Sequence, residues 1–318
     1  MFGKLKLLGK SGTVGNGNRV GVVFGPDAVL AFHIAIRPQA AARLLSAFTL
    51  EAPETERLAH GISEWAAQQH LKGTPTVMTL PLGSYGIFPV ERPDVPEQEL
   101  RSALRWRLKD LLGYPPSSAV IDYFDAPPAR QKRVEPLQVV AARIDELKPR
   151  VAALREAGLD PVRIDIPEFA LRNLVRIVPD NEVTTAMLSF EGNRGLLGIF
   201  REDRFYLSRT LDHGLPALDA SNDAADGLQA FDPASDRIAL EVQRTMDYYE
   251  SHFGTGPVKQ LLVLGGDARA SRLADYLRTA LGVASHALTP DALLEGSPLP
   301  GHDWMPLALG GILGLGRG

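Results

Sequence analysis

The chain has 318 residues, with 34 Lys and Arg against 38 Asp and Glu and no cysteine. A chain this long buries about three quarters of the surface that it exposes when unfolded, so its hydrophobic core is stable without disulfide or metal cross-links. The lack of cysteine excludes disulfides, thiolate metal sites and a cysteine nucleophile. The formal net charge of -4 gives no overall attraction to nucleic acid or anionic lipid, and no segment reaches the roughly 18 to 20 apolar residues of a membrane span.

The first 80 residues predict a β-hairpin, a helix and a strand. Apolar, β-branched stretches at 19–25 and 28–35 flank a Gly-Pro-Asp turn. Residues 38–51 fit either a third strand with its approach or a short helix. A helix over 55–71 and a strand over 76–80 follow. The cationic segment Met1–Lys10 reaches Gly and Ser before an apolar core develops, so we expect no signal peptide.

Residues 88–162 read as a compact unit of helix, strand, strand and helix. Its first helix carries a leucine stripe and ends at Gly113 and Pro115. On that helix Arg101, Arg105 and Lys109 lie at successive i, i+4 positions, with Trp106 off the leucine stripe. This basic face fits a solvated helix surface, or a contact with acidic lipid, nucleic acid or an acidic partner.

The second half repeats the opening of the first. A strand at 162–166 and a helix at 167–177 lead to three strands at 183–190, 195–201 and 204–209. The chain therefore looks like two halves that each start with a β-meander and continue into helices. Residues 212–236 hold six Asp and no Lys or Arg, which predicts a solvated loop or an acidic binding tail.

The turn at Gly265-Gly266 has some phosphate-binding character. It joins a buried strand at 259–264 to a helix at 268–281, where free backbone N–H groups would face a ligand. Asp267 in the first turn would repel a phosphate, so a plain tight turn stays open as the alternative. The seven histidines show no metal-ligand spacing, and no serine hydrolase elbow, P-loop or Rossmann glycine motif occurs, so we expect no metal site.

Four blocks of the chain, in order, resemble the PilM family of type IV pilus assembly proteins, and within it the MshI branch of the MSHA pilus system. The resemblance covers about residues 19–316 and rests on these blocks: LRSALRWRLKDLLGYPPSSAVIDYFD, AALREAGLDPVRIDIPEFALRNLV, EVQRTMDYYESHF and LLVLGGDARASRLADYLRTALG.

The resemblance implies an α/β, actin-like (ribonuclease H-like) fold of two duplicated lobes with an inserted small subdomain like that of FtsA. We therefore expect residues 1–87 and 163–182 to form lobe 1, 88–162 the insertion, and 183–318 lobe 2, with the C-terminal end returning to lobe 1 as an alternative. It also implies a cytoplasmic protein at the inner-membrane face, held by the tail of a PilN-like membrane protein and contacting other platform proteins.

PilM binds ATP between its lobes, and the matching loops here depart from the actin-like pattern. The first phosphate loop keeps Gly25 but has Val23 in place of Asp and Pro26 in place of Ser or Thr. The second has Ser189 in place of Asp, with Gly192 displaced. Phosphoryl transfer depends on metal and fixed donors around the γ-phosphate, so we expect no hydrolysis and no required cofactor, with ATP binding as a residual option.

The remaining nucleotide candidates implied by the resemblance are Asp165 at the connecting motif and Gly265 and Gly266 at the adenosine motif. We thus expect a non-catalytic scaffold of a pilus assembly platform. The alternatives are an ATP-binding switch or weak ATPase that holds magnesium through Glu191, Asp165 or Glu168, and a component like the cytoplasmic part of the type II secretion L protein.

The resemblance also implies a partner groove between lobe 1 and the insertion, lined by Tyr85–Val90, 97–112 and 119–124. An extended tail there would pair with a strand edge and place alternate side chains in pockets. The candidate contact residues, each of which also fits an ordinary core role, are Arg105, Trp106, Tyr123 and Phe124.

Overall fold

The computed structural model describes residues 17–25, 28–36, 42–51, 55–130, 136–178, 180, 182–202, 204–218, 233–295 and 305–315. The interpretations of Met1–Lys10, of Pro26 and of most of the acidic loop lie outside these ranges. Among the residues described, no helix is both long and apolar enough to span a membrane.

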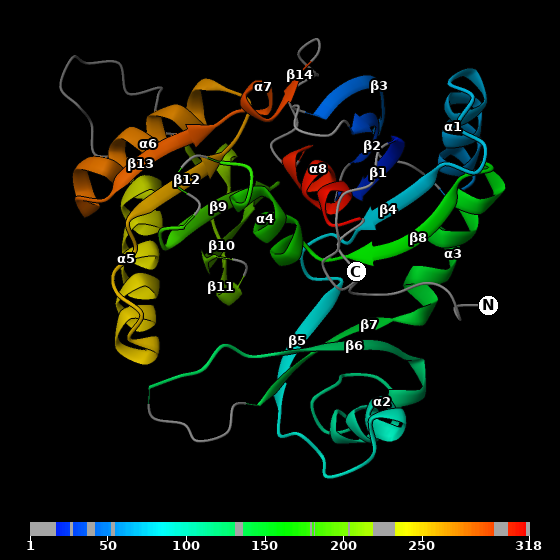
Figure 1. Cartoon of the computed structure of the whole chain (residues 1–318). Coiled ribbons are helices and arrows are strands. Elements are labelled where there is room, and N and C mark those ends of the chain that lie inside the picture. The colour runs from blue at the N-terminus through cyan, green and yellow to red at the C-terminus, as the bar shows by residue number, and fades with distance from the viewer. Residues whose placement is uncertain are drawn as a thin grey trace.

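Lobe 1 is built on a six-stranded mixed sheet (Figure 1). The strands, in sheet order, are β14 (Leu294–Glu295), β3 (Ala42–Glu51), β2 (Ala28–Ile36), β1 (Gly17–Phe24), β4 (Pro75–Thr79) and β8 (Asp160–Asp165). Helices α1 (Thr55–Gln68) and α3 (Ile144–Glu156) pack against one another and contribute to the same core as β1. The segment that the sequence left open between strand and helix is therefore the strand β3 from Ala42 onward.

Lobe 2 repeats this plan on a five-stranded sheet. The strands, in sheet order, are β11 (Arg204–Leu211), β10 (Arg194–Arg201), β9 (Thr185–Glu191), β12 (Gln260–Leu264) and β13 (Ala284–Leu288). In each lobe an antiparallel meander is followed by a strand that pairs in parallel with the first strand of the meander: β4 with β1, and β12 with β9. Helices α5 (Pro233–Phe253) and α6 (Ala268–Leu281) cover one face of this sheet.

Two helices lie between the lobes, at the centre of Figure 1: α4 (Pro167–Val175) and α8 (Met305–Leu313). One continuous core joins their apolar side chains to strands of both sheets, so each sheet is covered on both faces. The chain reaches α8 through α7 (Pro290–Leu293) and β14. Helix α8 packs on α4, β1 and β4, which places the C-terminal helix against lobe 1.

The insertion is a three-stranded antiparallel sheet covered by one helix. Its strands, in sheet order, are β5 (Tyr85–Val90), β7 (Leu137–Arg143) and β6 (Ala119–Asp125), and helix α2 (Glu97–Arg107) and the short 3-10 helix η1 (Pro116–Ser118) lie between β5 and β6 in the chain. Leu100, Leu104 and Leu108 bury the inner face of α2 on this sheet.

The insertion therefore spans 85–143, which differs from the expected 88–162. Helix α3 packs its Leu147, Val151 and Leu154 into the core of lobe 1, and β8 is the edge strand of the lobe 1 sheet. The apolar spacing of α3 predicts a helix, but it does not say which sheet the helix covers.

Candidate functional site

The five nucleotide candidates all follow the carboxyl ends of strands, where α/β proteins commonly bind ligands. Gly25 follows β1, Asp165 ends β8, Gly192 follows β9, and Gly265 and Gly266 follow β12. In lobe 1, β1, β4 and β8 run parallel, and in lobe 2 β9 and β12 do. The strand ends of each lobe thus meet at one edge of its sheet.

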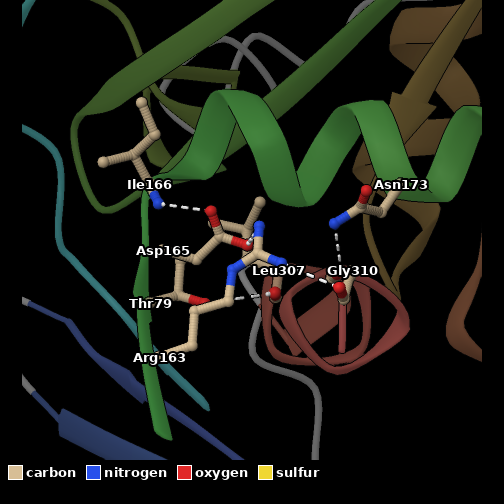
Figure 2. A network of polar contacts seen from close by, with 8 residues as sticks. Thr79, Arg163, Asp165, Ile166, Asn173, Leu307 and Gly310 are labelled. Atoms are coloured by element: carbon tan, nitrogen blue, oxygen red, sulfur yellow. Dashed lines mark hydrogen bonds and ion pairs between the residues drawn. The ribbon is translucent and has the colours of Figure 1, made fainter. Parts of the chain in front are cut away.

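Asp165 belongs to a buried network that holds the C-terminal helix (Figure 2). Its Oδ2 lies 2.9 Å from Nη2 of Arg163, and its Oδ1 accepts a hydrogen bond of 3.1 Å from the Ile166 amide. Arg163 also donates to the Gly314 carbonyl at 2.8 Å, and Asn173 donates to the Gly310 carbonyl at 2.8 Å. Burial raises the pKa of Asp165, and the charge of Arg163 lowers it in part.

The carboxylate of Glu191 joins the two lobes. It ends β9 of lobe 2 and accepts a hydrogen bond of 2.7 Å from the amide of Leu82, which follows β4 of lobe 1. Burial raises the pKa of Glu191 to about 7, while the bond from Leu82 and the charges of Arg194 and Arg150 lower it in part.

The backbone conformation of Gly192 and the close packing around Gly265 each explain why a glycine stands at that position. Gly192 has a φ of 57° in the two-residue turn between β9 and β10, a conformation that glycine adopts without strain. A Cβ on Gly265 would lie 2.5 Å from the Ala270 Cβ, so close packing of α6 against this turn accounts for that glycine.

The N-terminus of α6 is already capped. Asp267 accepts a hydrogen bond of 2.8 Å from the Arg269 amide, and Gly266 beside it is exposed. Although burial raises it, the pKa of Asp267 is lowered overall by its hydrogen bonds from Arg269. The Asp267 carboxylate therefore occupies, as an anion, the position at the N-terminus of α6 that a phosphate would take. This agrees with the interpretation of Gly265-Gly266 as a plain tight turn.

A cavity of about 400 Å³ lies where the insertion, lobe 1 and lobe 2 meet. It is lined from all three parts by Leu82, Gly83, Tyr85, Ile87, Gln138, Glu168, Arg194, Phe205, Tyr206, Leu207, Ser208 and Thr210. None of the five nucleotide candidates lines it. Four consecutive residues of β11, from Phe205 to Ser208, line the cavity. Because alternate side chains of a strand point to opposite faces of the sheet, a run of consecutive lining residues means that the edge of β11 borders the cavity.

Glu168 forms the polar centre of this cavity. It is buried at the start of α4 and accepts hydrogen bonds from the Tyr85 hydroxyl at 2.6 Å and the Ser208 hydroxyl at 3.3 Å. Burial raises the pKa of Glu168, and these two bonds lower it in part. One carboxylate thus connects β5 of the insertion, α4 and β11 of lobe 2.

The four partner candidates do not line one groove. Phe124 packs edge-on against Phe169 with ring centroids 4.9 Å apart, and lies 5.8 Å from Phe205, at the junction of the three parts. Tyr123 instead contributes to the core under α2, and its hydroxyl donates to Glu97. Arg105 is half-buried, and Trp106 is 71% exposed on α2.

Sequence reasoning missed the cavity and most of the residues around Glu168. Tyr85 and Ser208 lie 83 and 40 residues from Glu168 in the chain, so no local spacing relates them. Glu168 carries the one visible signal, because an acidic residue in the first turn of an otherwise buried helix needs hydrogen-bond partners.

No family model and no curated protein matches the chain. Solved structures do. The "PilM-PilN type IV pilus biogenesis complex" has 21% identity and a TM-score of 0.70, covering 94% of this chain and 98% of that chain. The cytoplasmic domain of EpsL, an inner membrane component of the type II secretion system of Vibrio cholerae, has 13% identity and a TM-score of 0.52, covering 93% and 95%.

A third structure is a Bacteroides thetaiotaomicron protein "with actin-like ATPase fold and unknown function", at 8% identity and a TM-score of 0.52, covering 92% of this chain and 95% of that one. Likenesses at these identities establish the fold. The prediction of an actin-like, two-lobed α/β fold is therefore confirmed.

Proposed function

We propose that this chain is a non-catalytic, PilM-like scaffold of a type IV pilus assembly platform of the MSHA kind. It works in the cytoplasm at the inner-membrane face, where it binds the cytoplasmic tail of a PilN-like membrane protein. The observation that carries the proposal is the cavity around Glu168, which an insertion of the FtsA kind forms with both lobes of an actin-like fold.

The cleft carboxylates support a scaffold over a nucleotide switch. A magnesium site would need free oxygens on Glu191, Asp165 or Glu168. In the structure Asp165 is paired with Arg163, Glu191 accepts from Leu82, and Glu168 accepts from two hydroxyls. A magnesium ion would have to share these oxygens with the contacts that they already make, and Val23 and Ser189 leave an ATP-binding switch without the loop carboxylates.

Calorimetry with MgATP tests this part of the proposal. We expect neither binding heat nor phosphate release, because the loops lack the carboxylates that hold magnesium. Magnesium-dependent phosphate release that is lost in Glu191→Ala would favour the switch. Heat of binding without hydrolysis would show that the cleft keeps a nucleotide as a static ligand.

The cavity also suggests how the tail is held. An extended segment beside β11 could pair with this strand, which is at the edge of the lobe 2 sheet as far as the structure describes it, and it would find apolar walls in Ile87 and Phe205. The tail site that we propose thus includes the cavity between β5 and β11, in addition to the groove between lobe 1 and the insertion.

Fluorescence anisotropy with the N-terminal peptide of the PilN-like protein from the same genome tests the tail site. We expect Ile87→Arg, which fills the cavity with a charged side chain, to weaken binding at least tenfold. Leu240→Arg, which adds the same charge at a side chain that is 48% exposed on α5, is the matched control and should leave the affinity unchanged.

Equal binding by both variants would mean that the tail binds outside the cavity. Failure of the unaltered chain to bind the peptide would contradict the scaffold proposal. The second alternative, a type II L-like component, would instead copurify with membrane proteins of a secretion system. The TM-scores of 0.70 and 0.52 support the PilM-like reading.

A further inference from the structure

Two large apolar side chains stand exposed at the outer end of the insertion. Trp106 is 71% exposed and Leu111 is 52% exposed. Since Leu100, Leu104 and Leu108 hold the inner face of α2 on its sheet, Trp106 points to the other side, away from the insertion's core. Figure 1 shows α2 at the bottom of the molecule, on the side of β6 and β7 that faces away from the two lobes.

Three basic residues are neighbours of these side chains in the sequence: Arg105, which is half-buried, and Arg107 and Lys109, which are exposed. Together with Trp106 and Leu111 they are called the Trp106 patch. Within the described ranges, no ion pair involves any of the three, and Asp110 is the acidic neighbour.

The acidic residues of α2 lie at its other end. There Glu97 pairs with Arg92 and accepts from Tyr123, and Glu99 is also in the first turn. Arg101, between the two ends, pairs with Asp122 at 2.8 Å. The helix is thus acidic at its start and basic at its end.

A helix dipole accounts for basic residues in the last turn, but it does not account for exposed Trp and Leu side chains among them. Trp beside Lys and Arg is typical of segments that sit in the headgroup layer of a bilayer, where the ring is half-immersed and the cations meet anionic lipid. A stable protein interface buries about 800 Å² per partner. Two apolar side chains on the convex surface of a helix are a small anchor for such an interface, while a bilayer supplies charge over its whole surface.

We propose that the Trp106 patch contacts the anionic surface of the membrane. The inference rests on the proposed function for its geometry, because a membrane-anchored tail bound at β5 and β11 would hold the insertion close to the bilayer. Alone the contact is weak. Joined to the tail it acts as the second point of a bivalent attachment and fixes the orientation of the protein on the membrane.

The test tethers the full chain to vesicles through a C-terminal histidine tag on nickel-chelating lipid, with brominated phosphatidylglycerol as the quencher. We expect part of the tryptophan emission to be quenched, and this part to be lost in Trp106→Phe, which leaves Trp65 and Trp304 as background. Arg107→Glu with Lys109→Glu should reduce the quenching several-fold, as should brominated phosphatidylcholine in place of phosphatidylglycerol.

The charge control is Arg57→Glu with Arg272→Glu, which changes the net charge equally on exposed helix faces elsewhere and should keep the quenching. Absence of quenching in the tethered wild type would overturn the inference. Weaker binding of the Trp106→Phe variant to the PilN-like protein in detergent would also overturn the inference, because the patch would then be a protein contact. The first outcome involves no tail binding, and the second requires that the unaltered chain binds the PilN-like protein. Failure of this inference can therefore be told apart from failure of the scaffold proposal.

Discussion

At the scale of single residues, Asp165, which the resemblance assigned to a nucleotide site, forms a buried ion pair with Arg163. Arg163 and Asp165 lie two residues apart on β8 and are 3% and 0% exposed. Arg163 also binds the Gly314 carbonyl, beyond the end of α8, where helix carbonyl groups lack partners within the helix. Removing one member of such a pair leaves the other charge buried and uncompensated.

Arg163→Ala is expected to lower the free energy of unfolding by about 3–5 kcal/mol, because it strands the buried carboxylate of Asp165. Urea unfolding followed by circular dichroism measures this. The control is the double substitution Arg163→Met with Asp165→Leu, which removes both charges and should cost less than the single change. A single change that proves as mild as the double would show that the ion pair contributes little.

Protonation of Glu191 predicts how stability depends on pH. Its pKa is about 7 in the folded protein, against 4.5 for an ordinary Glu, so the folded state binds more protons between these values. Stability is therefore expected to fall as pH rises from about 4.5 to 7, and to level off above. Asp165 and Glu168, whose pKa values burial also raises, act in the same direction.

Melting temperatures from pH 5 to 8 check this. Glu191→Gln keeps an acceptor for the Leu82 amide but cannot ionise, so its melting temperature should vary less with pH over this window. A variant with the same slope as the wild type would mean that Glu191 titrates at its ordinary value.

At the scale of elements, glycines let α8 sit between the lobes. A Cβ on Gly310 would lie 2.2 Å from the Ala170 carbonyl oxygen of α4, and one on Gly21 of β1 would lie 2.7 Å from the Ala308 carbonyl oxygen. Backbone rather than flexible side chains faces these positions, so a methyl group there must push an element away. This close approach explains how an apolar helix that contains Gly310 and Gly311 can lie buried between the lobes.

Gly310→Ala should destabilise the protein by about 1–3 kcal/mol, the usual cost of overpacking. Its control is Gly113→Ala, after α2, where a Cβ would meet nothing within 4 Å. Thermal unfolding of the two variants side by side is the measurement, and equal melting temperatures would show that α8 shifts without cost.

At the scale of the whole molecule, the insertion begins and ends on two neighbouring strands. It leaves lobe 1 at β5 and returns at β7, and Tyr85 and Ala142 are paired across these two strands. Paired strands lie about 5 Å apart, so roughly three residues can close the gap. Helix α3, by contrast, is part of the lobe 1 core.

Replacing residues 86–142 by a short Gly-Ser linker should thus give a folded two-lobed protein that no longer binds the partner tail. Deleting 88–162 should give an unfolded one, because it removes α3 and half of β8. Urea unfolding of both chains separates these outcomes. A cooperative transition for the second deletion would contradict the placement of α3.

The elements, the duplicated plan and the altered phosphate loops can all be recognised from the sequence. These features are written in local periodicity, turn residues and single substitutions such as Val23 and Ser189, and the fold that they pointed to was confirmed. The positions of the nucleotide candidates at strand ends followed for the same reason, because each motif lies within one loop.

Which surfaces meet became clear from the packing of the folded protein. Periodicity gives a helix an apolar face but not the sheet that this face covers, so the sequence placed α3 in the insertion. Glu168, Tyr85 and Ser208 come together from α4, β5 and β11 because three separately packed units share one junction. Such contacts depend on how whole elements pack, and no spacing along the chain encodes that.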